Sequence, residues 1–206
     1  MHAILPKNTK QIMIPGVTLQ FDTLELIPKV PPIGVAIIFH PDPKAGGSNT
    51  NKVVQQVAKT LTNKGYICYC PNLRGVGLSS GKHDNGIGEV DDGYEIYSYL
   101  VNLYPDLPVI IGGFSFGSAI ASALCTKVAY QHLILVGPAV TRYKVVIEDN
   151  HKTLVVHGDE DEIIPLADVL DFAKTYDQII NIVPNCGHFF HGKLLELGYL
   201  IDRWIN

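Results

Sequence analysis

A serine with a glycine two residues before it and another two residues after it stands near the middle of the chain, in Gly113-Phe114-Ser115-Phe116-Gly117. An apolar run precedes this pentapeptide and small residues follow it, a pattern that predicts a strand, a sharp turn and a helix. A serine in such a turn projects its hydroxyl above the end of the sheet, where it can attack a carbonyl carbon. The backbone N–H at the start of the helix is placed to stabilise an oxyanion. We therefore predict a nucleophilic serine; the alternative is a tight strand-to-helix turn whose serine is incidental.

A nucleophilic serine needs a base, and the base needs an acid that orients it. When the serine lies in a turn of this kind, the acid and then the histidine follow it along the chain, in loops at the carboxyl ends of later strands. One later apolar run leads into four consecutive acidic residues, 159–162, and the next leads into His188. The chain thus carries a candidate base and four candidates for the acid.

Other histidines and a glycine-rich loop suggest different chemistry at first sight. His157 ends a strand-like run and is interpreted as a packed, hydrogen-bonded residue, and His191 as a neighbour on the face of the last helix. The eight histidines show no metal-ligand spacing such as H-E-x-x-H, so no metal is predicted. Residues 75–80, GVGLSS, lack the third glycine of a dinucleotide fingerprint and have no acidic ribose partner at the expected distance. No cofactor is predicted.

To position these groups, the chain needs a sheet whose strands end at one edge. Continuous apolar runs, typical of parallel strands covered on both faces, alternate with helical patterns. The expected strands lie at 34–40, 66–70, 107–113, 133–138, 153–158 and 178–183, after two short antiparallel strands within 10–28. The expected helices lie at 51–64, 88–104, 115–129, 165–176 and 189–204. This alternation predicts the α/β class, with a mostly parallel central sheet and helices on both faces, in a single domain over residues 1–206.

Composition narrows the classes of function. The chain has 206 residues, 47% hydrophobic and 17% charged, which is typical of a packed globular protein. Its net charge is −4 and no basic patch stands out, so a nucleic-acid partner is not expected. The four cysteines lack zinc-site spacing and are expected to be buried thiols. The first eleven residues hold no apolar run long enough for a signal peptide, which makes a cytoplasmic setting the expectation.

One uncharged stretch, residues 107–126, has about the length of a membrane span. Pro108, the Gly112–Gly113 pair and three serines within it argue against that interpretation. A buried strand followed by a buried helix fits the stretch better, so no membrane span is predicted.

The pieces VVHGDEDEIIP and CGHFFHGKL are similar to the acid and histidine loops of the α/β-hydrolase superfamily. HPDPKAGGSNTNKVV, NLRGVGLSSG and FSFGS add to this similarity, which extends from about Gly34 to the end. HDNGIGEVDDGYEIYSYL also resembles the small, lidless bacterial branch of the superfamily, whose members are esterase- and dienelactone-hydrolase-like. The resemblance implies the α/β-hydrolase fold, with Asp161 as the acid and His188 as the base. It also implies a structural role for Arg74 and leaves Asp159 to bond backbone N–H groups at the turn.

The same resemblance implies two oxyanion donors, the backbone N–H groups of Phe116 and Asp42. Asp42 lies in the loop after the expected strand 34–40. A carboxylate aimed at an oxyanion would oppose catalysis, so we expect the Asp42 side chain to turn toward solvent or toward Lys44.

The expected function is that of a serine hydrolase, carboxylesterase-like, which cleaves a small-molecule ester or thioester through an acyl-enzyme on Ser115. Only residues 139–152 separate two of the expected strands where a lid is commonly inserted, too few for a lid domain with its own core. The alternative is a non-catalytic binding or interaction module that retains the hydrolase fold. The carboxylate of Asp42 keeps this alternative open, while the presence of serine, acid and histidine together argues against it.

Overall fold

The computed structural model of the chain describes residues 8–205, which form one eight-stranded sheet in the order β1-β2-β4-β3-β5-β6-β7-β8. Strand β2 runs antiparallel to both of its neighbours, and the strands from β4 to β8 run parallel to one another. The strands are β1 (Thr9–Pro15), β2 (Gln20–Leu26), β3 (Gly34–Phe39), β4 (Tyr66–Pro71), β5 (Val109–Phe114), β6 (His132–Val136), β7 (Thr153–Gly158) and β8 (Ile180–Val183). The predicted mostly parallel sheet with an antiparallel entry is therefore confirmed.

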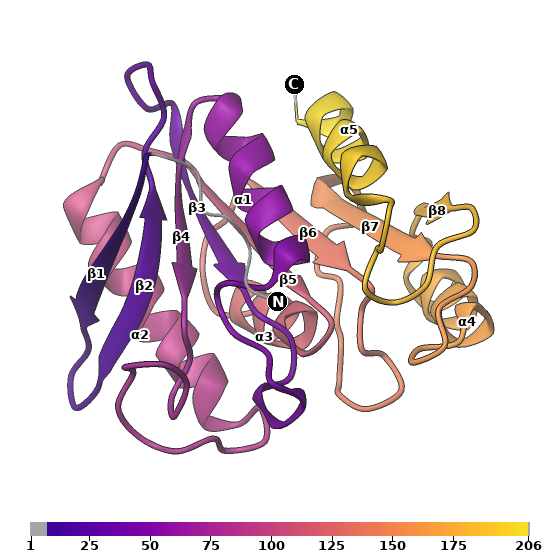
Figure 1. Cartoon of the computed structure of the whole chain (residues 1–206), viewed down its shortest axis with the longest axis horizontal. Coiled ribbons are helices and arrows are strands. Elements are labelled where there is room, and N and C mark those ends of the chain that lie inside the picture. Colours follow the sequence, from indigo (N-terminus) through magenta and orange to yellow (C-terminus); the bar gives the residue numbers. More distant parts are fainter. Residues whose placement is uncertain (1–7, 206) are drawn as a thin grey trace.

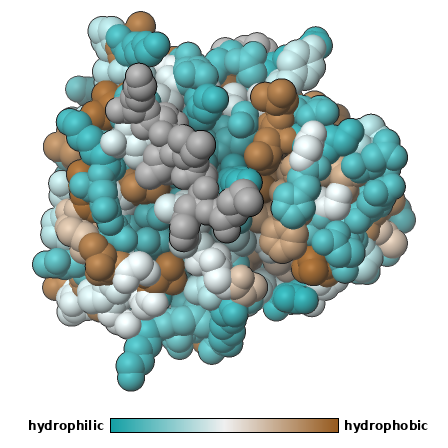
Figure 2. Space-filling model, in the orientation of Figure 1, coloured by the Kyte–Doolittle hydropathy of each residue, from teal (hydrophilic) through white to brown (hydrophobic). Residues whose placement is uncertain are grey.

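Helices cover both faces of the sheet (Figure 1). The helices are α1 (Lys52–Asn63), α2 (Gly88–Leu103), α3 (Phe116–Cys125), α4 (Leu166–Tyr176) and α5 (Leu194–Trp204), with short 3-10 helices η1 (Pro43–Ala45) and η2 (Asn150–Lys152). Helices α1 and α5 pack side by side on one face, and α2, α3 and α4 lie on the other. Hydrophobic side chains remain exposed over α5 (Figure 2), among them Leu195, which is 82% exposed.

Strand β3 shows why its apolar run is continuous. Successive side chains of a strand point to opposite faces. Val35, Ile37 and Phe39 enter the core beneath α2 and α3, whereas Ala36 and Ile38 enter the core beneath α1 and α5. With a helical layer on each face, no position on this strand meets water, and all six residues are buried.

Two helices are shorter than the sequence pattern predicts. Helix α3 ends at Cys125 rather than Ala129, because the Thr126 hydroxyl and the Lys127 amide both bond carbonyls three residues back and tighten the last turn. Helix α5 begins at Leu194 rather than Phe189, because Phe190 and Gly192 have φ values of 52° and 73°. Those values lie outside the helical region.

The late start of α5 corrects the prediction made for His191. His191 does not lie on the face of the last helix; it is an exposed residue of the turn that precedes α5.

The prediction about targeting concerns the first eleven residues, of which 1–7 lie outside the described part of the chain.

The uncharged stretch 107–126 forms β5 and then α3, as predicted. Across residues 8–205, no helix has both the length and the apolarity that crossing a membrane requires.

The connection between β6 and β7 is a loop, residues 137–152, that contains only η2. It lies against α3, where the Ser122 hydroxyl bonds both the amide and the carbonyl of Val146 at 2.6 Å. The Tyr143 ring packs edge-on against Phe116, with ring centroids 5.0 Å apart. The chain thus has a packed loop at the position where a lid domain was considered.

Candidate active site

Ser115 occupies the sharp turn between β5 and α3 and has φ 54° and ψ −116°, a conformation that non-glycine residues rarely adopt. Its amide bonds the carbonyl of Val136 on the neighbouring strand at 2.9 Å. A Cβ atom at Gly113 would collide with the carbonyl group of Gly117, and a Cβ at Gly117 would collide with that of Phe39. The two glycines therefore allow the backbone to hold the serine in this strained position.

Three of the predicted residues lie in one hydrogen-bonded line. His188 Nε2 is 3.0 Å from Ser115 Oγ, and His188 Nδ1 is 2.7 Å from Asp161 Oδ2. The side chains come from the loops after β5, β8 and β7, which end at the same edge of the sheet. With Nδ1–H donated to the carboxylate, Nε2 presents its lone pair to the serine hydroxyl.

The carboxylate of Asp161 is buried but held in its ionised form. Burial raises its pKa, yet hydrogen bonds from His188 and from the backbone amides of Ile164 and Ile163 outweigh burial, so the pKa lies below its ordinary value. The amides of Ile163 and Ile164 bond Oδ1 at 2.9 and 2.7 Å, which leaves Oδ2 for the histidine. An anion fixed in this way can orient the ring of His188 and stabilise its positive charge.

The other acidic residues of the loop connect it to the histidine loop. Asp159 Oδ1 accepts the amide of Cys186 at 3.2 Å, and Glu162 Oε2 accepts the amide of His188 itself at 3.2 Å. The backbone-binding role predicted for Asp159 is present, but its partner is 27 residues away rather than in its own turn. The sequence pattern did not indicate the role of Glu162, because an exposed glutamate beside three other acids carries no sign of its partner.

His157 is fully buried on β7, as expected of a packed histidine. Its Nε2 lies 3.0 Å from the carbonyl oxygen of Ile164 and 3.6 Å from Asp161 Oδ2. Burial lowers the pKa of its ring below the ordinary value, against the raising effect of Asp161. A neutral ring that donates to Ile164 supports the turn whose amides hold the acid.

The two residues predicted to donate to an oxyanion, Asp42 and Phe116, follow the parallel strands β3 and β5 at the serine's edge of the sheet. Phe116 is the first residue of α3, so its amide has no partner within the helix. Asp42 precedes η1, and its Oδ1 accepts the backbone N–H of Lys44 at 2.8 Å. The carboxylate thus turns toward Lys44, which is one of the two orientations expected for it. It bonds the backbone of Lys44 rather than the ammonium group.

Two buried carboxylates, Asp92 and Glu89, bind residues of the loop between β4 and α2. Asp92 binds the guanidinium of Arg74 through Nη2 at 2.6 Å and Nε at 2.9 Å, which gives Arg74 the structural place expected for it. Glu89, with no exposed surface, accepts the amides of Asp84 and Gly86 at 2.7 and 2.8 Å. The sequence pattern did not single out Glu89, since a glutamate in the first turn of a helix is typical of a solvated face.

Residues 32–149, more than half of the chain, match the family model of the serine aminopeptidases, S33. The chain belongs to this family of α/β hydrolases.

Two solved structures and one further relative resemble this hydrolase over most of their length. An α/β serine hydrolase homologue from Coxiella burnetii is 31% identical, with 99% of this chain and 100% of that chain covered and a TM-score of 0.89. A lidless α/β serine hydrolase from Xanthomonas campestris is 29% identical, with 98% and 96% covered and a TM-score of 0.90. An uncharacterized protein from Rickettsia prowazekii is 31% identical over 83% of this chain and 78% of its own. The chain is thus a hydrolase with the α/β-hydrolase fold.

In this hydrolase, the buried His40 makes the fold less stable as the pH falls. Its Nδ1 lies 2.7 Å from the Pro41 carbonyl and its Nε2 accepts the Leu73 amide at 3.1 Å, so protonation of Nε2 breaks the second bond. Burial lowers the pKa of His40 from 6.5 to about 4. As the pH falls below 6.5, the unfolded chain therefore takes up a proton at His40 that the folded protein does not. By pH 5 this difference lowers the free energy of unfolding by about 2 kcal/mol. Urea unfolding at pH 7.5 and pH 5 measures the loss.

The matched variant is His40→Gln, whose amide oxygen can accept the Leu73 amide without titrating. We expect the fall in unfolding free energy between the two pH values to be smaller in the variant by about 2 kcal/mol. An equal fall in both proteins would contradict the role given to His40.

Proposed function

We propose that this hydrolase is a serine esterase that cleaves small-molecule esters or thioesters through an acyl-enzyme on Ser115. The observation that carries the proposal is the unbroken line from Ser115 Oγ to His188 Nε2 and from His188 Nδ1 to Asp161 Oδ2. In the proposed roles Ser115 is the nucleophile, His188 the general base and then acid, and Asp161 the orienting acid. The amides of Phe116 and Asp42 are the proposed oxyanion donors.

The reaction proceeds in two halves. Ser115 Oγ forms a bond to the carbonyl carbon while its proton passes to His188 Nε2, and the carbonyl oxygen becomes an anion that the two amides stabilise. The C–O or C–S bond then breaks, and His188 gives its proton to the departing alcohol or thiol. Water then attacks the carbonyl carbon of the acyl-enzyme and gives a proton to His188. The bond to Ser115 Oγ breaks, Ser115 regains its proton from His188, and the carboxylic acid product leaves.

The position of the Asp42 carboxylate supports an enzyme over a binding module. The carboxylate is the feature that kept the binding module open, because a negative charge aimed at the oxyanion would oppose the reaction. Its oxygen is instead engaged with the Lys44 amide, and the loop beyond it continues as η1. Together with the line of three side chains, this orientation favours catalysis.

A fluorophosphonate probe tests the proposal, because it reacts with a serine only when a base and an oxyanion site activate that serine. We expect stoichiometric labelling of the folded protein at Ser115, identified by mass spectrometry of the peptide, and none of Ser115→Ala. Ser98→Ala, which removes a hydroxyl on α2 that bonds the Tyr94 carbonyl, is the matched control and should label as the wild type does. Folded wild-type protein that stays unlabelled would favour the binding module.

A further inference from the structure

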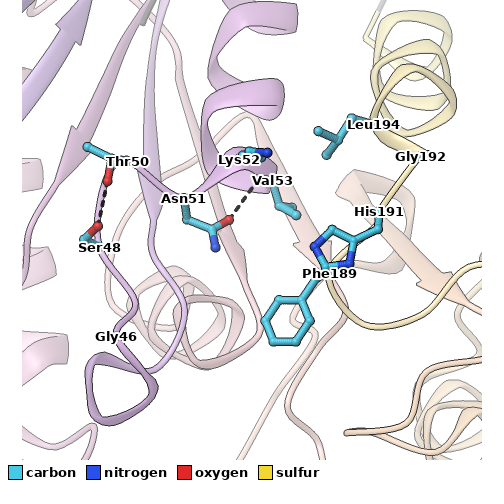
Figure 3. Close-up of a pocket in the computed structure, with 10 residues that line it drawn as sticks. All are labelled: Gly46, Ser48, Thr50, Asn51, Lys52, Val53, Phe189, His191, Gly192 and Leu194. Carbon is cyan, nitrogen blue, oxygen red and sulfur yellow. Dashed lines mark hydrogen bonds between the residues drawn. The ribbon is translucent and has the colours of Figure 1, made fainter. Parts of the chain in front are cut away.

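A groove of about 380 Å³ lies between the segment that leads into α1 and the turn that precedes α5 (Figure 3). One wall carries Ser48, Thr50 and Asn51. The other carries Phe189 and His191, whose rings project from the turn toward the first wall. We refer to the space between these two walls as the leaving-group groove.

The groove adjoins the proposed catalytic line through Phe189. This residue follows His188 directly, and its ring centroid is 5.2 Å from that of His188 and 6.4 Å from that of Phe114. Phe189 is 42% exposed and lines the groove. Phe189 thus contacts the ring of His188 and also lines the groove.

The proposed chemistry decides which half of an ester points toward the groove. The carbonyl oxygen must face the amides of Asp42 and Phe116, and the departing oxygen must face His188 Nε2, which protonates it. The leaving group is then directed toward the histidine loop, and the acyl group away from it. The groove is bounded by that loop on one side and by the continuation of the Asp42 loop on the other.

The wall on the histidine loop is aromatic. The Phe189 and His191 rings are stacked, with an interplanar angle of 28° and centroids 5.9 Å apart. The opposite wall is polar, and its Ser48 and Thr50 hydroxyls are 2.9 Å apart. A flat ring can lie on the aromatic wall with its edge toward the hydroxyls, which an aliphatic ring of similar size cannot do as closely.

We propose that the leaving-group groove binds the alcohol half of the ester and selects a planar aromatic alcohol. The assignment rests on the proposed esterase function. It adds a substrate class to that function, namely esters of aromatic alcohols, and makes Phe189 a residue that determines specificity.

The test compares kcat/KM for benzyl acetate and cyclohexylmethyl acetate, which share the acyl group and carry primary alcohols of similar size. We expect the wild type to prefer the benzyl ester by about fivefold, from the stacking of one aromatic pair. Phe189→Leu keeps an apolar side chain and removes the ring, so the preference should fall to near one. The ratio is the readout, because a disturbance of the neighbouring His188 lowers both rates by the same factor.

Two controls make the result specific. Tyr199→Leu removes an exposed aromatic ring of α5 that does not line the groove, and should keep the wild-type ratio. A second ester pair, ethyl phenylacetate and ethyl cyclohexylacetate, places the same rings in the acyl half, and its ratio should not respond to Phe189→Leu.

A wild-type ratio near one, or a ratio that Phe189→Leu leaves unchanged, would overturn the assignment. A change confined to the second ester pair would overturn it as well, because the groove would then hold the acyl group. Absence of turnover for all four esters would instead overturn the proposed esterase function, and the assignment with it.

Discussion

Ser115→Ala is expected to remove ester turnover while leaving the fold intact. Alanine keeps the Cβ atom that the turn already accommodates at φ 54°, so the substitution adds no backbone strain. It removes the oxygen that would form the acyl-enzyme, and His188 Nε2 loses its partner at 3.0 Å. Loss of a serine nucleophile lowers kcat by about four to six orders of magnitude. The measurement is kcat for p-nitrophenyl acetate, with urea unfolding of both proteins to compare stability.

Ser98→Ala is again the matched control, and its turnover should equal that of the wild type. Turnover of Ser115→Ala within tenfold of the wild type, in protein that unfolds at the same urea concentration, would show that another residue is the nucleophile. A variant that has lost its cooperative unfolding transition would mean that the hydroxyl supports the turn itself.

Local patterns were enough to predict the strands and the serine turn. The apolar runs predicted β3, β5 and β7 to within two residues at each end, because a strand buried on both faces must be apolar throughout. The glycines around Ser115 indicated the turn because a Cβ at either position collides with backbone. Helix ends were less predictable. The end of α3 depends on a threonine hydroxyl that bonds a carbonyl three residues back, which periodicity does not record.

The order of serine, acid and histidine was also visible in the sequence, but the contacts between their loops were not. Asp159 bonds Cys186 and Glu162 bonds the His188 amide across 27 and 26 residues. Such bonds depend on how two loops meet at the sheet edge, and any carboxylate in the loop could have made them. The direction of the Asp42 side chain could not be predicted either, because both expected orientations suit an aspartate before a short helix.

A comparison of kcat in Asp161→Asn and Asp159→Asn tests which of the four acidic residues at 159–162 orients His188. Asparagine at 161 can still accept the Ile163 and Ile164 amides through its oxygen, so the turn should hold. Its NH₂ group then faces His188 Nδ1 and favours the tautomer with the proton on Nε2, which cannot accept the proton of Ser115.

Loss of the orienting acid in this way lowers kcat by about four orders of magnitude. Asparagine at 159 keeps an oxygen for the Cys186 amide at 3.2 Å and leaves the His188 ring untouched, so kcat should fall less than tenfold. Both variants and the wild type are measured with p-nitrophenyl acetate at the same pH. If Asp159→Asn were the more damaging of the two, the acid would be the wrong residue of this loop, and the 2.7 Å contact between Asp161 and His188 would serve structure rather than catalysis.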